Sequence, residues 1–359
     1  MRALQFTLAF LLILGPLLFR FPAREESFSP SINALYYYPF EGDPSPLPNS
    51  WVKESVRPFN AVWIPNGDAS RLILPNRRVD LNSEKMAFAP IHGDGYFIFQ
   101  RVGSEISFLS SLGELLWKKP FPAYPVTAPS GSPVFLMTGD ANRVDVLDAS
   151  GNLKGVKHIA GNFLTDYKFS RSGRTCFVFG AGGLIVIDPQ GEIAFKFESQ
   201  DPAFYKSCAL SPDGQVAAVH ALRGESDVVF VVRQKEKKAS VSETLPLSAE
   251  YTHSLPLAVS NSGSVLVIPP EGALFFKSGD LVWKSNEPAG LAYAFSDESF
   301  LAFANGTRTE VIDANGNRIA RIPSPFGSGE PYQILPGPRK QQFLLQSYTG
   351  LVVFGFVSE

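Results

Sequence analysis

A repeat of about forty residues runs through most of the chain and constrains the fold more than any other feature. Its anchors are turn residues, namely Gly93, Gly131, Gly173, Gly214, Gly263, Ser299 and Arg339. Successive anchors are separated by 38, 42, 41, 49, 36 and 40 residues. A second glycine follows five of the anchors after 16 to 20 residues. Two landmarks that stay in phase indicate a structural repeat.

Each repeat unit contains four short apolar runs separated by turn residues, and the chain has 30 glycines and 29 prolines to supply those turns. Four strands in about 40 to 45 residues are typical of a β-propeller blade. The near-continuous apolar runs VFLM, LIVI, VVFVV and VLVI indicate strands buried on both faces, as in blades packed face to face. The sequence therefore predicts an all-β chain with a single β-propeller, most simply of seven four-stranded blades.

Aspartates end the third run in three of the units. Asp148, Asp188 and Asp313 each stand three residues before a glycine. An aspartate at such a position accepts hydrogen bonds from the turn that follows it. We therefore expect these carboxylates to organise turns rather than to bind metal.

The last repeat unit ends at the carboxyl terminus after about three runs, so its outer strand should come from the amino-terminal part of the chain. The candidates are 61–65 (AVWIP) and 71–75 (RLILP). We expect one of them to pair beside 351–354. Such a strand would close the ring and leave no edge along its circle.

The amino terminus is apolar from residue 3 to residue 19 and is flanked by Arg2 and Arg20. Seventeen such residues are near the lower limit for a membrane-spanning helix. A signal sequence cleaved after about residue 21 is the alternative, although Phe21 stands where a small residue is usual. We expect an anchor or signal over 1–23, a Pro/Tyr-rich linker over 24–58 and the propeller over 59–359, exported from the cytoplasm.

Two blade endings, LGELLWKK at 112–119 and SGDLVWKS at 278–285, resemble the quinoprotein-type repeat. The turns SPDG at 211–214 and SNSG at 260–263 resemble those of WD-type and TolB-type repeats. The resemblance to the β-propeller superfamily covers about residues 60–359. It implies the fold but not an activity, because the same propeller carries many functions.

Proteins with quinoprotein-type repeats include quinone-dependent dehydrogenases and outer-membrane-assembly scaffolds. The dehydrogenases carry adjacent cysteines, whereas this chain has only Cys176 and Cys208, which we expect to be buried free thiols. The scaffolds carry a lipid-anchoring cysteine, and no cysteine precedes Cys176. The resemblance therefore matches neither group fully.

Little in the sequence indicates catalysis. The four histidines, His92, His158, His220 and His253, show no metal-binding spacing, and no phosphate-binding or nucleophile motif occurs in a suitable context. We expect no catalytic residues, no metal and no cofactor, although the chain could still be an enzyme. A net charge of −2 also argues against nucleic acid as a partner.

One pattern suggests a binding surface. Several tyrosines precede the anchors by 6 to 12 residues, which places them where innermost strands begin. Together with their neighbours they predict an aromatic, mixed-charge face at one mouth of the central channel. The predicted face comprises Tyr124, Asp166, Tyr167, Lys168, Phe204, Tyr205, Lys206, Tyr251, His253, Tyr293 and Tyr332.

The hypothesis that follows is a non-catalytic, membrane-tethered propeller that acts as a protein-binding scaffold outside the cytoplasm. Its partners would be proteins at the aromatic face and the membrane at residues 3–19. Two alternatives stay open. One is a propeller that senses a small ligand or glycan. The other is a quinoprotein-type or hydrolase-type enzyme with its site in the channel, for which only Asp166 and His253 are candidates.

Overall fold

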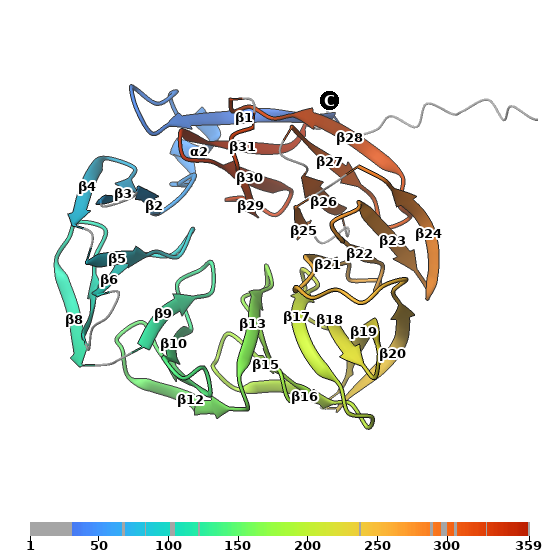
Figure 1. Ribbon diagram of the computed structural model, residues 1–359. Coiled ribbons are helices and arrows are strands. Elements are labelled where there is room, and N and C mark those ends of the chain that lie inside the picture. Colours follow the sequence, from blue (N-terminus) through green and yellow to red (C-terminus); the bar gives the residue numbers. More distant parts are fainter. Residues whose placement is uncertain are drawn as a thin grey trace, which may run out of the picture.

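Eight β-sheets stand in a ring in the computed structural model, within the residues that it describes (Figure 1). Those residues are 31–66, 69–82, 84–100, 105–120, 123–236, 238–287, 290–295, 300–304, 307–327 and 329–357. Seven of these sheets have four strands and one has three. The described chain is an all-β, single β-propeller with eight blades, so the prediction of seven blades is wrong.

The blades follow one another along the chain, and we number them in that order (Figure 1). In each blade the strands are antiparallel, and the first strand lies innermost. Blade 1 consists of β2 (Val62–Asn66), β3 (Ala69–Leu74) and β4 (Arg77–Asn82), and blade 2 of β5 (Lys85–Phe88), β6 (Tyr96–Gln100), β7 (Glu105–Leu109) and β8 (Leu115–Pro120). Blade 3 consists of β9 (Ala123–Thr127), β10 (Val134–Thr138), β11 (Arg143–Leu147) and β12 (Leu153–Ala160). Blade 4 consists of β13 (Leu164–Phe169), β14 (Thr175–Phe179), β15 (Gly183–Ile187) and β16 (Ile193–Glu198).

The second half of the ring repeats this order, and its last blade takes its outermost strand, β1, from the other end of the described chain. Blade 5 consists of β17 (Phe204–Leu210), β18 (Val216–Arg223), β19 (Ser226–Lys235) and β20 (Lys238–Pro246), and blade 6 of β21 (Leu257–Val259), β22 (Val265–Val267), β23 (Ala273–Lys277) and β24 (Asp280–Ser285). Blade 7 consists of β25 (Leu291–Phe295), β26 (Phe300–Ala304), β27 (Arg308–Ile312) and β28 (Arg318–Pro323). Blade 8 consists of β29 (Gln333–Pro336), β30 (Gln342–Gln346), β31 (Gly350–Val357) and β1 (Ser31–Pro39).

The ring is closed by a strand near the amino terminus, but not by either of the predicted candidates. The closing strand is β1, which pairs with β31 from Ser31 opposite Val357 to Pro39 opposite Gly350. The segments 61–65 and 71–75 instead contribute to β2 and β3 of blade 1. Strand β1 lies inside the stretch 24–58 that the sequence suggested as a linker. The three consecutive tyrosines alternate between the two faces of that strand, and Tyr36 and Tyr38 are buried.

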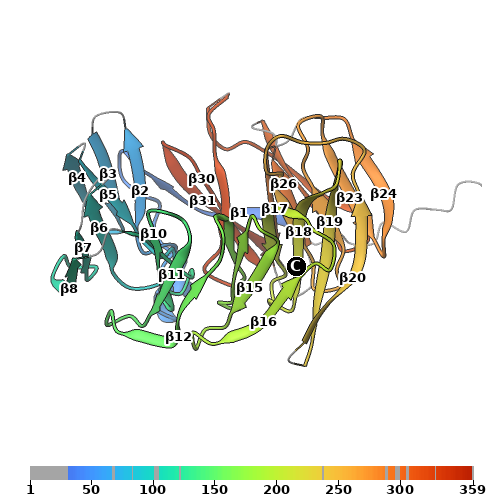
Figure 2. The ribbon, with the colours of Figure 1, turned by 60° about the horizontal axis from the view of Figure 1, so that its bottom comes forward.

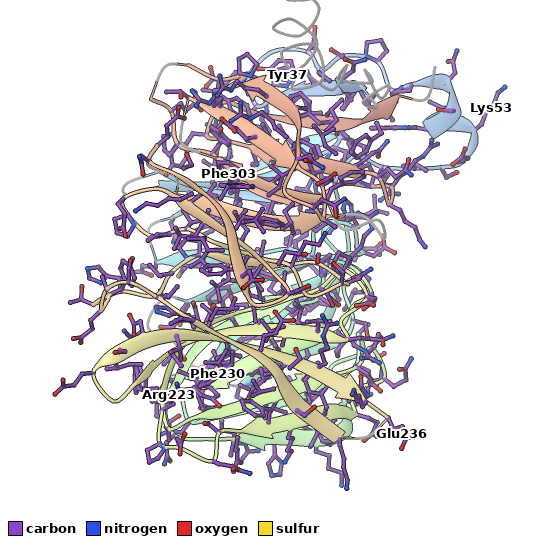
Figure 3. The ribbon with its side chains drawn as sticks, turned by 90° about the vertical axis from the view of Figure 1, so that its right-hand side faces the viewer. Tyr37, Lys53, Arg223, Phe230, Glu236 and Phe303 are labelled. Atoms are coloured by element: carbon purple, nitrogen blue, oxygen red, sulfur yellow. The ribbon has the colours of Figure 1, made fainter. Side chains whose placement is uncertain are left out.

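The core lies between the blades. Each buried apolar cluster of the described residues combines side chains from two neighbouring blades, and eight such clusters fill the eight interfaces of the ring. Figure 2 shows the blades standing side by side, and Figure 3 shows the side chains that fill the spaces between them, among them Phe230 and Phe303. This packing explains the apolar runs, because an inner strand covered on both faces needs apolar residues throughout.

The aspartate turns form as predicted. In blade 4, the Asp188 carboxylate accepts backbone N–H bonds from Gln190 and Glu192, both at 2.9 Å. Asp313 accepts the corresponding bonds from Asn315 and Asn317 at 2.8 Å. Asp148 accepts one from Asn152 at 2.9 Å. The glycine three residues after each aspartate has a φ of 79° to 84°, which a side chain rarely adopts, so the landmark glycines have a conformational cause.

The described residues contain one short helix, α2 (Asn49–Lys53), and none long and apolar enough to cross a membrane. The apolar segment at residues 3–19 lies outside the described residues.

Candidate functional site

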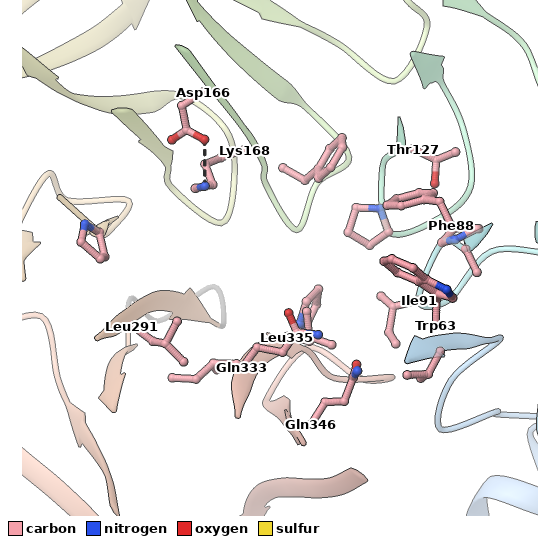
Figure 4. A pocket seen from close by; sticks show the side chains of 18 of the residues that line it. Trp63, Phe88, Ile91, Thr127, Asp166, Lys168, Leu291, Gln333, Leu335 and Gln346 are labelled. Carbon is pink, nitrogen blue, oxygen red and sulfur yellow. Dashed lines mark hydrogen bonds and ion pairs between the residues drawn. The ribbon is translucent and has the colours of Figure 1, made fainter. Parts of the chain in front are cut away.

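An axial pocket of about 640 Å³ lies where the innermost strands of the eight blades meet (Figure 4). Every blade contributes to its wall, which is mainly apolar. Trp63 of blade 1, Phe88 and Ile91 of blade 2, and Leu291 and Leu335 of blades 7 and 8 provide much of this surface. A volume between about 300 and 1,000 Å³ is usual for sites that hold a small ligand or a side chain of a partner.

Loops that connect the first and second strands of several blades close one end of the pocket. His92 Nε2 lies 2.9 Å from the carbonyl oxygen of Pro336, and the His92 backbone N–H donates to Pro129 at 2.8 Å. Arg171 of blade 4 donates across the axis to the Gly337 carbonyl of blade 8 at 3.4 Å. Burial lowers the pKa of His92 to about 4, despite its hydrogen bonds to backbone carbonyls. The pocket therefore has a floor that is tied together by hydrogen bonds.

The wall carries one ion pair among its described residues. Lys168 Nζ lies 3.0 Å from Asp166 Oδ1, and both residues belong to β13. The other carboxylate oxygen, Oδ2, accepts the backbone N–H of Cys208 on β17 at 3.1 Å. Burial disfavours the Lys168 ammonium, but the neighbouring Asp166 carboxylate outweighs it and raises the pKa of Lys168. Among the described residues that line the pocket, Asp166 and Lys168 are the charged ones.

The face of the ring on which the innermost strands begin carries exposed aromatic side chains, none of which lines the pocket itself. Tyr124, Phe163 and Phe204 stand at or next to the first residues of β9, β13 and β17, and Tyr348 lies in the turn between β30 and β31 on the same face. Their exposed fractions are 43%, 59%, 47% and 55%. We call these four residues the aromatic rim. Large aromatic side chains left in water on one face are typical of interaction surfaces.

The structure brings only part of the predicted face together. Tyr124, Phe204 and His253 are exposed on the face where the innermost strands begin, and Asp166 and Lys168 line the pocket. Tyr167 is half-buried and packs against Phe169 and Phe177. The side chain of Tyr293 lies outside the described residues.

The other three tyrosines are buried between blades. Tyr205 stacks on Phe197 with ring centroids 6.4 Å apart, and burial raises its pKa to about 12. Tyr332 exchanges a hydrogen bond with Thr309 at 3.1 Å. The Tyr251 hydroxyl donates to Glu271 at 2.6 Å. These hydroxyls are satisfied inside the protein and face no common surface.

Lys206 belongs to a buried polar network rather than to the open face. Its ammonium contacts both carboxylate oxygens of Asp227, at 2.7 and 3.0 Å. Asp227 also accepts the Tyr251 backbone N–H at 2.7 Å and lies 3.2 Å from His220 Nε2. Burial lowers the pKa of His220, so it stays neutral, and its Nδ1 accepts the Leu255 N–H at 3.2 Å. This network joins the long connection after β20 to blade 5.

Sequence reasoning missed Phe163 and Tyr348 because it searched for tyrosines at a fixed distance before the anchors. Phe163 lies ten residues before Gly173, and Tyr348 lies in a turn after the last anchor. A search for bulky apolar residues at the junctions between blades would have found Phe163. The described residues contain no group of three or more metal-ligating side chains.

No protein-family model matches the chain, and no curated protein matches it. Among solved structures, the C-terminal WD40 domain of Sif2 is 11% identical, with a TM-score of 0.52 over 84% of this chain and 97% of that one. A streptogramin B lyase is 11% identical, with a TM-score of 0.44 over 91% and 98% of the two chains. Hsv2 of Kluyveromyces lactis is 10% identical, with a TM-score of 0.48 over 71% and 89%. At these identities the likeness to Sif2 concerns the fold alone, and the chain is a β-propeller repeat protein.

Proposed function

We propose that the protein is a non-catalytic scaffold that binds a polypeptide partner at the open end of its axial pocket. The observation that carries this proposal is the aromatic rim on one face of the ring, together with the mainly apolar axial pocket of about 640 Å³. Rigid aromatic side chains provide large contact areas at low entropic cost, and they dominate the binding energy of many interfaces. The WD40-like fold supports the proposal, because propellers of this kind commonly bind proteins at one face.

The pocket suggests how the partner is held. An apolar side chain of the partner would enter between Trp63, Phe88 and Leu335, while its backbone or a polar group meets the Asp166–Lys168 pair. The Asp166 side chain is 17% exposed and that of Lys168 is 51% exposed, so a hydrogen bond to the more buried Asp166 carboxylate is stronger than it would be in water. The rim would then cover the contact and exclude solvent.

The test compares two sets of substitutions at exposed apolar residues. The rim variant combines Tyr124→Ser, Phe163→Asn and Phe204→Ser; asparagine is chosen because Phe163 has a φ of 61°. The control variant combines Leu153→Ser and Leu281→Ser, which are 55% and 52% exposed on the outer strands β12 and β24. A partner is first cross-linked to the wild-type protein and identified, and its affinity is then measured by calorimetry with each purified variant.

We expect the rim variant to lose at least about 100-fold in affinity, since aromatic hot spots cost about 2 kcal/mol or more each when truncated. The control should stay within about threefold, because scattered exposed apolar residues contribute little. Equal affinities of the rim and control variants would contradict the proposed surface.

A second candidate function is the sensing of a small ligand or glycan. The size of the axial pocket favours it, since about 640 Å³ matches a small organic molecule. Native mass spectrometry of gently purified protein distinguishes the two functions. A stoichiometric small molecule that is displaced by the substitution Leu335→Arg would favour sensing.

We further propose that the propeller is exported and tethered to a membrane. The support is the apolar run at residues 3–19 with its flanking arginines. Sequencing of the mature amino terminus and alkaline extraction of membranes test this proposal. A mature chain that begins after about residue 21 and is released from membranes would replace the tether by a cleaved signal.

A further inference from the structure

The only two cysteines of the chain meet between blades 4 and 5. Cys176 lies on β14 and Cys208 on β17, and both are free, buried thiols in the structure, as predicted. Their sulfur atoms lie 2.6 Å apart. Non-bonded carbon atoms rest at about 3.5–4.0 Å, so this separation is short for two larger sulfur atoms. Sequence reasoning did not expect two strands of adjacent blades to place the thiols in contact.

Interactions with β13 hold both cysteines in place. On one side, Cys176 pairs with Lys168 in the register of β13 and β14. On the other, the Cys208 N–H donates to Asp166 Oδ2 at 3.1 Å, which joins β17 to β13. Both cysteines are fully buried among apolar side chains of blades 4 and 5. Neither sulfur can therefore turn away without disturbing the interface.

We propose that Cys176 and Cys208 form a disulfide that links blade 4 to blade 5. In the step, a thiolate of one cysteine attacks a small disulfide such as oxidised glutathione and releases one glutathione thiolate. The second cysteine then attacks the mixed disulfide and releases the other. The two cysteines lose two protons and two electrons in total, and the glutathione disulfide is reduced to two thiols.

The bond would form before the two blades dock. Burial raises the pKa of the Cys208 thiol well above its usual range, so the folded protein holds almost no thiolate there. In the unfolded chain both cysteines are accessible and have ordinary reactivity. Once formed, the disulfide would be shielded from reductants by the same burial.

The proposed disulfide lies next to the strand that carries the charged residues of the axial pocket. Asp166 and Lys168 belong to β13, whose neighbours β14 and β17 carry the two sulfur atoms. A covalent link between β14 and β17 would hold the pocket's ion pair in place on both sides. The disulfide would therefore preorganise the charged part of the proposed binding site.

The experiment refolds the full chain from urea in a mixture of oxidised and reduced glutathione, with matched samples of Cys176→Ala, Cys208→Ala and the double variant. Each sample is denatured without reductant, alkylated and weighed by mass spectrometry. We expect the wild type to carry no alkyl group and to weigh two hydrogens less than the reduced chain. A digest should contain one peptide pair joined through residues 176 and 208.

Two readouts keep the proposal falsifiable. Two alkylated cysteines in correctly folded wild-type protein from the oxidising mixture, or a bond between two chains, would overturn it. Refolding in reductant instead of the oxidising mixture should lower the melting temperature of the wild type but leave that of the double variant unchanged, and equal shifts in both would also overturn the proposal. Because the refolding is done in vitro, its outcome does not depend on where the cell places the protein.

Discussion

His92 is an ionisable residue in the floor of the axial pocket. Its ring nitrogen Nε2 lies 2.9 Å from the Pro336 carbonyl oxygen, which identifies Nε2 as the protonated nitrogen of a neutral ring. Burial lowers its pKa to about 4, and the Arg171 guanidinium acts in the same direction. A neutral His92 thus connects blade 2 to blade 8 across the narrow blade 1.

The lowered pKa of His92 predicts a loss of stability in acid. Below about pH 6.5 the unfolded chain protonates this histidine while the folded protein does not, so unfolding becomes more favourable as the pH falls toward 4. Between pH 7 and pH 4.5 the free energy of unfolding of the wild type should fall by about 1–3 kcal/mol more than that of His92→Gln. Urea titrations at several pH values measure this difference. Parallel pH profiles for the two proteins would contradict the assignment.

At the same scale, the sequence could predict where an innermost strand begins but not which side chains face outward there. Tyr124 and Tyr205 precede their anchors by similar distances, yet Tyr124 is 43% exposed and Tyr205 is fully buried. The strands β13 and β17 each contain an irregularity in register near their first residues, between Leu164 and Asp166 and between Tyr205 and Ser207. Such a shift changes which side chains face the neighbouring blade, and the spacing of residues does not report it.

Among the elements, β1 has the largest effect on the closure of the ring. It lies at the outside of blade 8, and Tyr38 reaches from it toward blade 1. The Tyr38 ring packs on Phe59 with centroids 5.0 Å apart, and its hydroxyl donates to the Pro75 carbonyl at 3.2 Å. Sequence reasoning treated this segment as a linker because prolines follow it closely.

Two neighbouring tyrosines of β1 test this role. Tyr38→Ala removes a buried ring and its hydrogen bond, and it should cost about 3–5 kcal/mol of unfolding free energy. Tyr37→Ala, on the opposite face of the same strand and 40% exposed, should cost less than about 1 kcal/mol. Denaturant unfolding measures both values. If Tyr38→Ala were as stable as Tyr37→Ala, β1 would not contribute to closure.

The element β4 is unusual because it is both the third and the last strand of its blade. In the described chain it pairs only with β3, whereas third strands such as β7, β11 and β15 are paired on both sides. The side chains of Arg77, Arg78 and Asp80 are exposed along it, and charged residues of this kind protect an open edge against aggregation.

Hydrogen exchange should reveal this open edge. About half of the amides of β4 have no partner strand, so they should exchange much faster than those of β11, which occupies the same place in blade 3. Exchange followed by mass spectrometry of peptic peptides resolves the two strands. Equal protection of β4 and β11 would show that another molecule or segment covers the edge.

At the scale of the whole molecule, the sequence predicted the architecture and missed one blade. The seven anchors all lie in blades 2 to 8, each of which has four strands. Blade 1 lacks a fourth strand, and the next blade begins only three residues after β4 ends. Because blade 1 is shorter than the repeat of about forty residues, it carries no anchor in phase with the other blades. Its strands β2 and β3 were therefore interpreted as candidates for the closing strand. Ring closure depends on contacts between distant segments, which a local repeat pattern does not contain.

A closed ring should unfold as one unit, although open repeat arrays often lose cooperativity. The interface between blades 8 and 1 holds an apolar cluster like the other seven in the described chain, so no interface is left as a starting point for separation. Phe59 lies in this closing cluster, and Phe135 lies in the cluster between blades 3 and 4; both are fully buried.

The paired variants Phe59→Ala and Phe135→Ala test this cooperativity. Each should lower the unfolding free energy by about 3–5 kcal/mol, since each removes a fully buried ring. In both, tryptophan fluorescence and far-ultraviolet circular dichroism should report the same single transition in urea. An additional early transition in Phe59→Ala alone would show that the closing interface separates first, because the other seven interfaces would then still hold an open array of blades together.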